Sequence, residues 1–194
     1  MIQMLEITET PIDTDAVLNS VSDESSGASV LFVGTTRRWT VRPGDSQSHA
    51  GEQPQTLETS HLIYEAYRPM AEAKLRELAV EACRRWPICK VSIVHRAGRV
   101  DPRDPSVAIA VSTPHRREAF EAGQWLIDTV KHEVPIWKQE HYVQNGPEWI
   151  HPTPGSCNCD HVPLEVASAQ SDLAQTNVSG EISPESLPER RSHS

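Results

Sequence analysis

The feature that most constrains this chain is a buried-strand pattern that passes into a helix and then, after a proline, into a second extended segment. Residues 106–112 are nearly all apolar, as in a strand covered on both faces. The sequence predicts a helix from Thr113 to about Lys131, and Pro135 separates it from an extended segment at 136–142. This stretch therefore predicts a sheet with at least one long helix packed on it.

The remaining patterns alternate between strands and helices. Strands are predicted at 5–8, 27–34, 62–67 and 91–96, and helices at 14–21 and from Pro69 to Trp86. The second of these helices keeps its apolar residues at helical spacing and is stopped by Pro87. The order predicts an α+β fold with a mixed or antiparallel sheet and two long helices.

Apolar residues are unevenly distributed. They make up 37% of the 194 residues, below the usual globular level, and the deficit lies mainly at the end of the chain. We therefore expect one domain at 1–151, with a mobile polar loop at about 40–57, followed by a disordered acidic tail at 152–194.

The net charge of −9 comes from the ends of the chain. Between residues 57 and 150, 13 lysines and arginines balance 13 aspartates and glutamates. A neutral domain argues against nucleic-acid binding and permits a small anionic substrate. Without a signal-peptide pattern or a membrane-length apolar run, we expect a cytosolic chain with reduced thiols and no membrane partner.

A candidate anion site lies at the start of the long helix. Thr113 or Ser112 can cap it, Pro114 suits its first turn, and His115 and Arg116 follow. Backbone N–H groups at a helix start favour an anion, whereas cationic side chains there oppose the helix dipole unless an anion binds. The alternative, solvated arginines that pair with nearby acids, is equally compatible with the sequence.

Arg37 and Arg38 follow a predicted strand at the edge of the polar loop. They can complete an anion site, although ordinary surface arginines would look the same. His95 and Arg96 end another strand, where a structural role is favoured.

Two lysines are candidates for chemistry. Lys138 lies in an apolar extended segment beside Trp137, where a lysine can act as a base or nucleophile, although strand lysines usually face solvent. Lys131 suits the last turn of the helix, and this position alone explains it. A metal site is not expected, because its candidate ligands match no strong spacing and lie in the predicted tail or directly before it. These ligands are Cys157, Cys159, His151 and His161.

Six motifs in order resemble the large, catalytic subunit of molybdopterin synthase over about residues 4–151. Together they are highly specific, although each alone would be weak. They are Phe32-Val-Gly-Thr-Thr-Arg37, Tyr64-Glu-Ala-Tyr-Arg-Pro-Met-Ala71, Arg85-Trp-Pro-Ile88, His95-Arg-Ala-Gly98, His115-Arg-Arg-Glu-Ala-Phe-Glu-Ala122 and Pro135-Ile-Trp-Lys-Gln-Glu140.

The resemblance implies an α+β fold with a hammerhead-like subdomain and a sulfurtransferase activity in molybdenum cofactor biosynthesis. Such enzymes convert cyclic pyranopterin monophosphate into molybdopterin by installing two sulfurs. The sulfur comes from a thiocarboxylate at the C-terminal Gly-Gly of a small ubiquitin-like subunit. The resemblance also implies a heterotetramer built on a homodimer of the large subunit. It implies no metal or other cofactor.

The resemblance also assigns site residues. Lys131 and Lys138 match the active-site lysines, while Arg37, His115 and Arg116 match residues that hold the substrate. The neighbouring pocket positions are Thr35, Thr36, Gln139 and Glu140. The Thr35–Thr36 pair departs from the commoner Lys-Val type, and the long polar loop and the tail depart as well.

The two halves of this set are far apart along one helix. His115 and Lys131 are sixteen residues apart, about 24 Å on a continuous helix. We therefore expect a site at a dimer interface, with the two ends supplied by different protomers. Two other readings remain open: a module that docks a ubiquitin-like tail without chemistry, and a phosphate-ester enzyme that uses His115 as base.

Overall fold

The computed structural model describes residues 1–41 and 56–150. The predicted tail at 152–194 and most of the predicted loop at 40–57 lie outside the described residues. Both ends of that loop are strands, because β3 (Trp39–Val41) pairs with the start of β4 (Thr56–Ala66). Strand structure therefore reaches two residues into each end of the segment predicted as loop.

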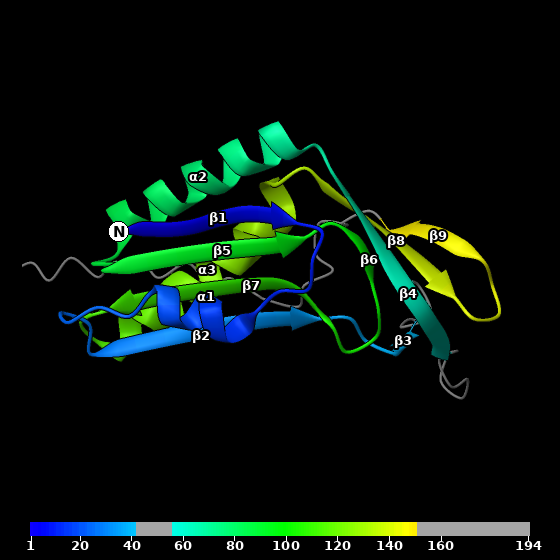
Figure 1. The fold of residues 1–194 in the computed structure, drawn as a ribbon, viewed down its shortest axis with the longest axis horizontal. Helices are drawn as coiled ribbons and strands as arrows, with labels where there is room; N and C mark the ends of the chain where they lie inside the picture. Colours follow the sequence, from blue (N-terminus) through cyan, green and yellow to red (C-terminus); the bar gives the residue numbers. More distant parts are fainter. Residues whose placement is uncertain (42–55, 151–194) are drawn as a thin grey trace, which may run out of the picture. The chain divides into compact units, whose positions relative to one another are not determined.

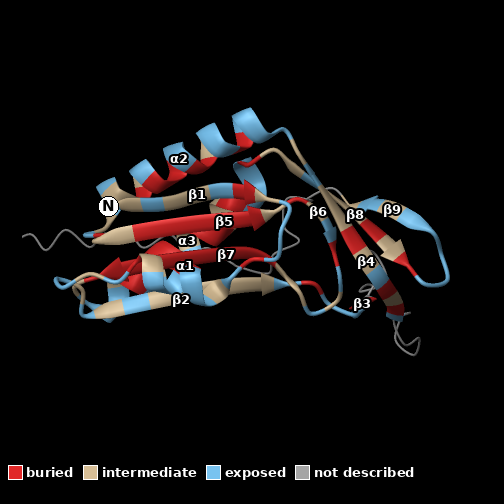
Figure 2. Cartoon of the chain, in the orientation of Figure 1, coloured by how far each residue is buried: buried red, intermediate tan, exposed pale blue. Residues whose placement is uncertain are grey.

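The first of two sheets has four strands in the order β1-β5-β7-β2 (Figure 1). β1 and β5 are parallel, and the other neighbours are antiparallel. β5 and β7 are buried along almost their whole length (Figure 2), which explains their nearly continuous apolar sequences. In sheet order the strands are Ile2–Thr8, Lys90–Arg96, Pro105–Thr113 and Ala28–Thr35.

Helices cover both faces of this sheet. α2 (Arg68–Arg85) and α3 (Arg116–Glu133) pack in the larger core cluster, and α1 (Thr14–Ser20) packs in the smaller one on the other face (Figure 1). The side chain of Asp13 caps α1 by accepting a hydrogen bond from the Ala16 N–H at 2.9 Å. The predicted α+β class with two long helices is confirmed.

α3 starts later than the sequence indicated. The expected caps, Ser112 and Thr113, are the last residues of β7, and the cap position is occupied by His115 without a side-chain cap bond. Thr113 stays in the sheet because it pairs with Ala28, and its hydroxyl donates to the His115 carbonyl at 2.7 Å. Pro114 therefore joins the strand to the helix rather than forming its first turn.

The second sheet is antiparallel and has the order β3-β4-β8-β9, with β6 also paired to β4. Its further strands are Gly98–Val100 (β6), Ile136–Tyr142 (β8) and Pro147–Ile150 (β9). This small sheet provides the subdomain expected from the resemblance. Because side chains alternate along a strand, Lys138, Glu140 and Tyr142 share one face of β8, and Gln139 and His141 share the other.

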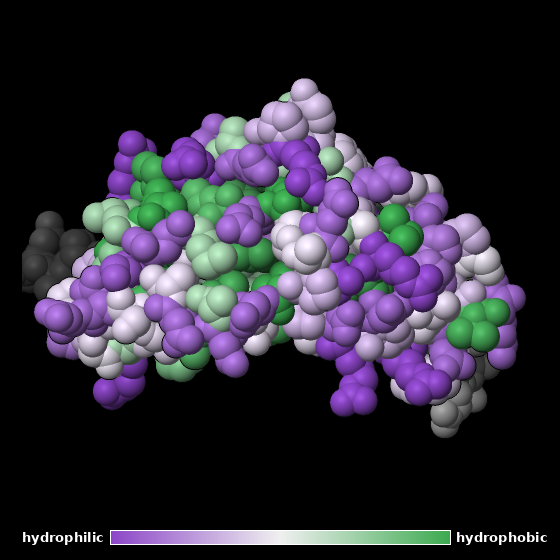
Figure 3. Space-filling model, viewed as in Figure 1, coloured by the Kyte–Doolittle hydropathy of each residue, from purple (hydrophilic) through white to green (hydrophobic). Residues whose placement is uncertain are grey.

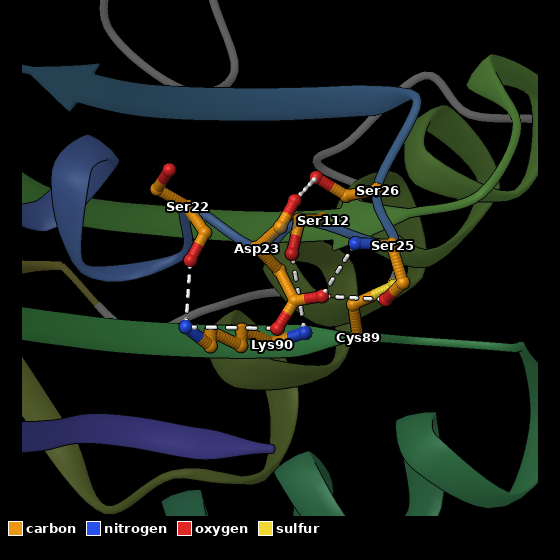
Figure 4. A network of polar contacts seen from close by, with 7 residues as sticks. All are labelled: Ser22, Asp23, Ser25, Ser26, Cys89, Lys90 and Ser112. Atoms are coloured by element: carbon orange, nitrogen blue, oxygen red, sulfur yellow. Dashed lines mark hydrogen bonds and ion pairs between the residues drawn. The ribbon is translucent and has the colours of Figure 1, made fainter.

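A polar network fixes the loop between α1 and β2 to the start of β5 (Figure 4). The Lys90 ammonium donates to the Ser22 carbonyl at 2.6 Å and lies 3.6 Å from a carboxylate oxygen of Asp23. Two hydrogen bonds from Ser25 lower the pKa of Asp23. The Lys90 N–H also takes the Ser112 hydroxyl as acceptor at 3.1 Å, so this end of the sheet is held by local structural contacts.

The surface in Figure 3 shows apolar side chains chiefly over the first sheet and α2, whereas the part over the second sheet is mostly hydrophilic. Within residues 1–41 and 56–150, no helix combines the length and apolar character needed to cross a membrane. The same residues contain no group of three or more His, Cys, Asp and Glu side chains arranged to hold a metal ion. The cysteine–histidine cluster considered from the sequence lies outside the described residues.

Candidate active site

A cavity of about 680 Å³ lies between the last turn of α3, the ends of β2, β5 and β7, and the inner face of the second sheet. Its volume is in the range of sites for small molecules. The lining residues that matter below are Thr35, Thr36, Arg37, Tyr64, His95, Ser106, Lys131, Lys138 and Glu140.

One wall carries a buried carboxylate. Glu140 is only 5% exposed, and its two oxygens have different partners. The Lys138 ammonium lies 2.7 Å from one oxygen, and the Tyr142 hydroxyl donates to the other at 2.9 Å. Lys138 is one-third exposed, so its ammonium faces the cavity while Glu140 fixes its position behind it.

Two further cations line the cavity without a carboxylate partner. In the described part of the chain, neither Arg37 nor Lys131 forms an ion pair within 4 Å. Both side chains belong to exposed residues at the cavity mouth. A guanidinium and an ammonium that form no ion pair with a described carboxylate are suited to bind an anionic group such as a phosphate.

Beside these charged groups, another part of the cavity lining is polar but uncharged. The buried imidazole of His95 has a pKa lowered to about 4 by desolvation, so it is neutral at physiological pH. Its Nδ1 lies 2.9 Å from the Arg96 carbonyl oxygen, which requires the proton on Nδ1 and leaves Nε2 as an acceptor. Its ring meets the edge of the Tyr64 ring at 5.1 Å between centroids.

Tyr64 also stays in its neutral form. Burial raises the pKa of its hydroxyl, and the charge of Glu140 acts in the same direction. Neighbouring Ser106 partly offsets this rise in pKa, and its own hydroxyl donates to the Gly34 carbonyl at 3.1 Å. The cavity thus combines a cationic side with a side of neutral hydrogen-bonding groups.

The sequence matches the family described as MoaE protein over residues 7–133. The chain belongs to the MoaE family. The match covers strands β2, β5 and β7 of the first sheet, the last two residues of β1, all three helices and the lysine at the end of α3.

Relatives with known names agree with this assignment. The molybdopterin synthase catalytic subunit of Staphylococcus carnosus is 40% identical over 148 residues, 76% of this chain and 89% of the relative. That of Bacillus subtilis is 38% identical over 148 residues, 76% of this chain and 85% of the relative. The crystal structure of molybdopterin synthase from Staphylococcus aureus is 39% identical, has a TM-score of 0.65, and is matched over 76% of this chain and 96% of that one.

The MoaE-family fold brings six of the nine residues assigned from the resemblance to one cavity. They come from the end of β2 and the two residues after it, from the last turn of α3 and from β8. These residues are Thr35, Thr36, Arg37, Lys131, Lys138 and Glu140.

Three of the nine lie elsewhere. The side chain of Gln139 is on the other face of β8, where its amide oxygen lies 2.8 Å from Nε2 of His141. His115 and Arg116 are exposed at the far end of α3, which runs without interruption to Glu133. One chain therefore does not bring its His115–Arg116 end to its own lysine cavity.

Sequence reasoning missed the neutral wall of the cavity. Tyr64 and Ser106 were not considered as site residues, and His95 was assigned a structural role. Tyr64 and Lys138 are cross-strand partners on β4 and β8, and they are on the same face. This pairing could have identified Tyr64 as a site residue. It is known only once the register of β4 with β8 is known, because the two residues are 74 positions apart in the sequence.

Proposed function

We propose that this chain is the catalytic subunit of a molybdopterin synthase and acts in molybdenum cofactor biosynthesis. Its reaction converts cyclic pyranopterin monophosphate into molybdopterin by transfer of two sulfurs. The observation that carries the proposal is one cavity lined by Arg37, Lys131 and Lys138, the last of which is paired with the buried carboxylate of Glu140.

Arg37 and Lys131 are assigned to the substrate phosphate. They are the cavity cations that no described carboxylate neutralises, so an anion gains their full attraction on binding. His115 and Arg116 of a second copy are assigned to the same substrate, since α3 carries its own pair away from its own cavity.

Lys138 is assigned to proton transfer. Opening of the cyclic phosphate leaves an oxygen that needs a proton. In each sulfur transfer the thiocarboxylate sulfur bonds to the substrate, and water then attacks the acyl carbon, so the C–S bond breaks and a carboxylate stays on the carrier. An ammonium held at 2.7 Å by Glu140 is positioned to donate a proton and to be reprotonated through the same cavity. Glu140 acts by orienting Lys138, since its carboxylate is buried and paired with the lysine.

The sulfur donor is assigned as a small ubiquitin-like subunit with a thiocarboxylate on its C-terminal Gly-Gly. Tyr64, His95 and Ser106 offer neutral donors and acceptors that suit the backbone of a thin extended tail or the edge of a pterin. Two copies of this chain with two small subunits form the assigned heterotetramer, placed in the cytosol.

The test is molybdopterin formation by the purified chain, the substrate and the thiocarboxylated small subunit. Product is expected with the thiocarboxylate and not with the same subunit ending in a carboxylate. Lys138→Ala should form the complex with the small subunit but yield no product. Complex formation without product from the wild-type chain would show a docking module instead, and turnover without any small subunit would show a different phosphate-ester enzyme.

A further inference from the structure

The segment that carries Arg37 into the cavity is held through its main chain by the turn before β7. The Thr36 N–H donates to the Asp104 carbonyl at 3.1 Å, and the Thr36 carbonyl accepts from the Arg103 N–H at 2.8 Å. Thr36 is 4% exposed, whereas Arg37 next to it is exposed at the cavity. This two-way exchange fixes the direction in which the chain leaves Thr36.

The turn needs support of its own. Arg103 has a φ of +79°, a left-handed conformation that non-glycine residues adopt only when their surroundings impose it. Inside the turn, the Asp104 N–H donates to the Asp101 carbonyl at 3.1 Å. The strained residue is one of the two that bind Thr36, so loss of the turn geometry removes both contacts.

Arg96, at the end of β5, supplies a side-chain anchor for this turn. Its guanidinium lies 3.1 Å from the Asp104 carboxylate, and its side chain is only 11% exposed. The Nε of Arg96 is buried and has no hydrogen-bond partner among the described residues. Asp104, whose side chain is 45% exposed, is therefore the counter-charge of a largely buried cation, which favours a defined position for the pair.

We infer that Arg96 is a positioning residue for Arg37. Through Asp104 it fixes the turn, the turn fixes the main chain of Thr36, and Thr36 directs the Arg37 guanidinium into the cavity. The inference rests on the proposed function, in which Arg37 binds the substrate phosphate. It assigns to Arg96 an effect on substrate affinity, beyond the structural role favoured from the sequence.

The experiment is a double-mutant cycle on KM and kcat for the cyclic phosphate substrate, at saturating thiocarboxylated small subunit. Asp104→Asn keeps the shape of the side chain and removes its charge, so the fold is retained. We expect it to raise KM about tenfold with little change in kcat, as for a misplaced binding group. Arg96→Lys keeps the charge and should fall between wild type and Asp104→Asn.

Arg37→Ala gives the second arm of the cycle. In that background Asp104→Asn should change KM less than twofold, because the group that it positions is already gone. Arg99→Gln is the matched control: it breaks an exposed 2.8 Å ion pair to Asp101 in the same turn and should leave KM unchanged.

Three results would overturn the inference: an unchanged KM in Asp104→Asn, an equal rise in Arg99→Gln, or an undiminished effect in the Arg37→Ala background. An unchanged KM in Arg37→Ala alone would instead remove the phosphate assignment of the proposed function, and the inference with it. Thermal unfolding of each variant shows whether the protein measured is folded.

Discussion

Glu140 and Lys138 set the charge balance of the cavity at the scale of single residues. Lys138→Ala leaves the buried carboxylate with only the Tyr142 hydroxyl among the partners described above. Because Lys138 is one-third exposed, we expect a loss of about 1–2 kcal/mol in the free energy of unfolding, less than for a fully buried pair. Chemical denaturation measures this loss.

The double variant Lys138→Ala/Glu140→Gln separates stability from catalysis. It removes the uncompensated charge, so most of the unfolding free energy should return while product formation stays absent. Lys74→Ala is the matched control, since Lys74 is 31% exposed but its partners, Glu77 and Glu133, are exposed carboxylates. A loss of stability in Lys74→Ala as large as in Lys138→Ala would contradict the burial argument.

His95 should make the stability of the domain depend on pH. Its pKa is about 4 in the folded protein against 6.5 for an unperturbed histidine, so the unfolded chain binds the proton more tightly. Stability is therefore fully present above pH 6.5 and falls as the pH drops towards 4, by on the order of 3 kcal/mol.

His95→Gln should flatten this slope when unfolding is measured between pH 7 and pH 4. His132→Gln, which changes an exposed histidine at the same cavity, should leave the slope as in the wild type. Equal slopes in all three proteins would mean that His95 does not titrate in this range.

The sequence indicated the charged residues of the site because chemistry limits which residue types can serve. The lysines, Arg37 and Glu140 came from motifs, and the cavity contains them. The neutral wall was not foreseen, since Tyr64 and His95 carry no pattern that separates a cavity lining from a core. Their role depends on register and burial, which are properties of the folded chain.

At the scale of elements, two glycines differ in what a side chain would meet. A Cβ on Gly27 would lie 2.4 Å from the Pro114 carbonyl oxygen, at the joint between β7 and α3. A Cβ on Gly123, inside α3, would meet Val30 and Val111 at 3.6 and 3.7 Å, which is ordinary contact.

Gly27→Ala should therefore lower the free energy of unfolding, because backbone atoms must shift. Gly123→Ala should raise it by up to about 1 kcal/mol through better helix propensity and added packing. Thermal and denaturant unfolding of both variants measures the difference. A destabilised Gly123→Ala would show that the space between α3 and the sheet is tighter than these contacts indicate.

Elements with a recognisable pattern of apolar residues or a cap were predictable, and the strands of three or four residues were not. α2 and the buried strands β5 and β7 have enough residues for a period to be recognised. The short strands β3, β6 and β9 exist because β4 and β8 offer edges to pair with, and this is a tertiary cause. The start of α3 was misplaced for the same reason, since pairing with Ala28 keeps Thr113 in the sheet.

At the scale of the whole molecule, α3 separates the two halves of the proposed site. His115 and Lys131 bracket an uninterrupted helix, about 24 Å along its axis. We expect one complete site to need the lysine end of one protomer and the His115–Arg116 end of its partner.

Mixed dimers test this arrangement. Lys138→Ala and His115→Ala chains should each be inactive as homodimers. A hybrid of the two carries one site with both defects and one with neither, so about half of the wild-type activity per hybrid is expected. Hybrids with no activity, after mixed dimers are verified by differential tagging, would contradict a shared site.

The pairing of β3 with β4 affects how the length of the segment between them can vary among related proteins. Val41 and Thr56 are direct cross-strand partners, so the two ends of the segment between them are about 5 Å apart. Lengthening a segment with such closely spaced ends adds little closure entropy, about 0.6 kcal/mol for each doubling. Thr40 and Thr59 beside this point line the cavity. Insertions between these ends can accumulate without disturbing the register of β3 and β4, although the strands themselves border the cavity.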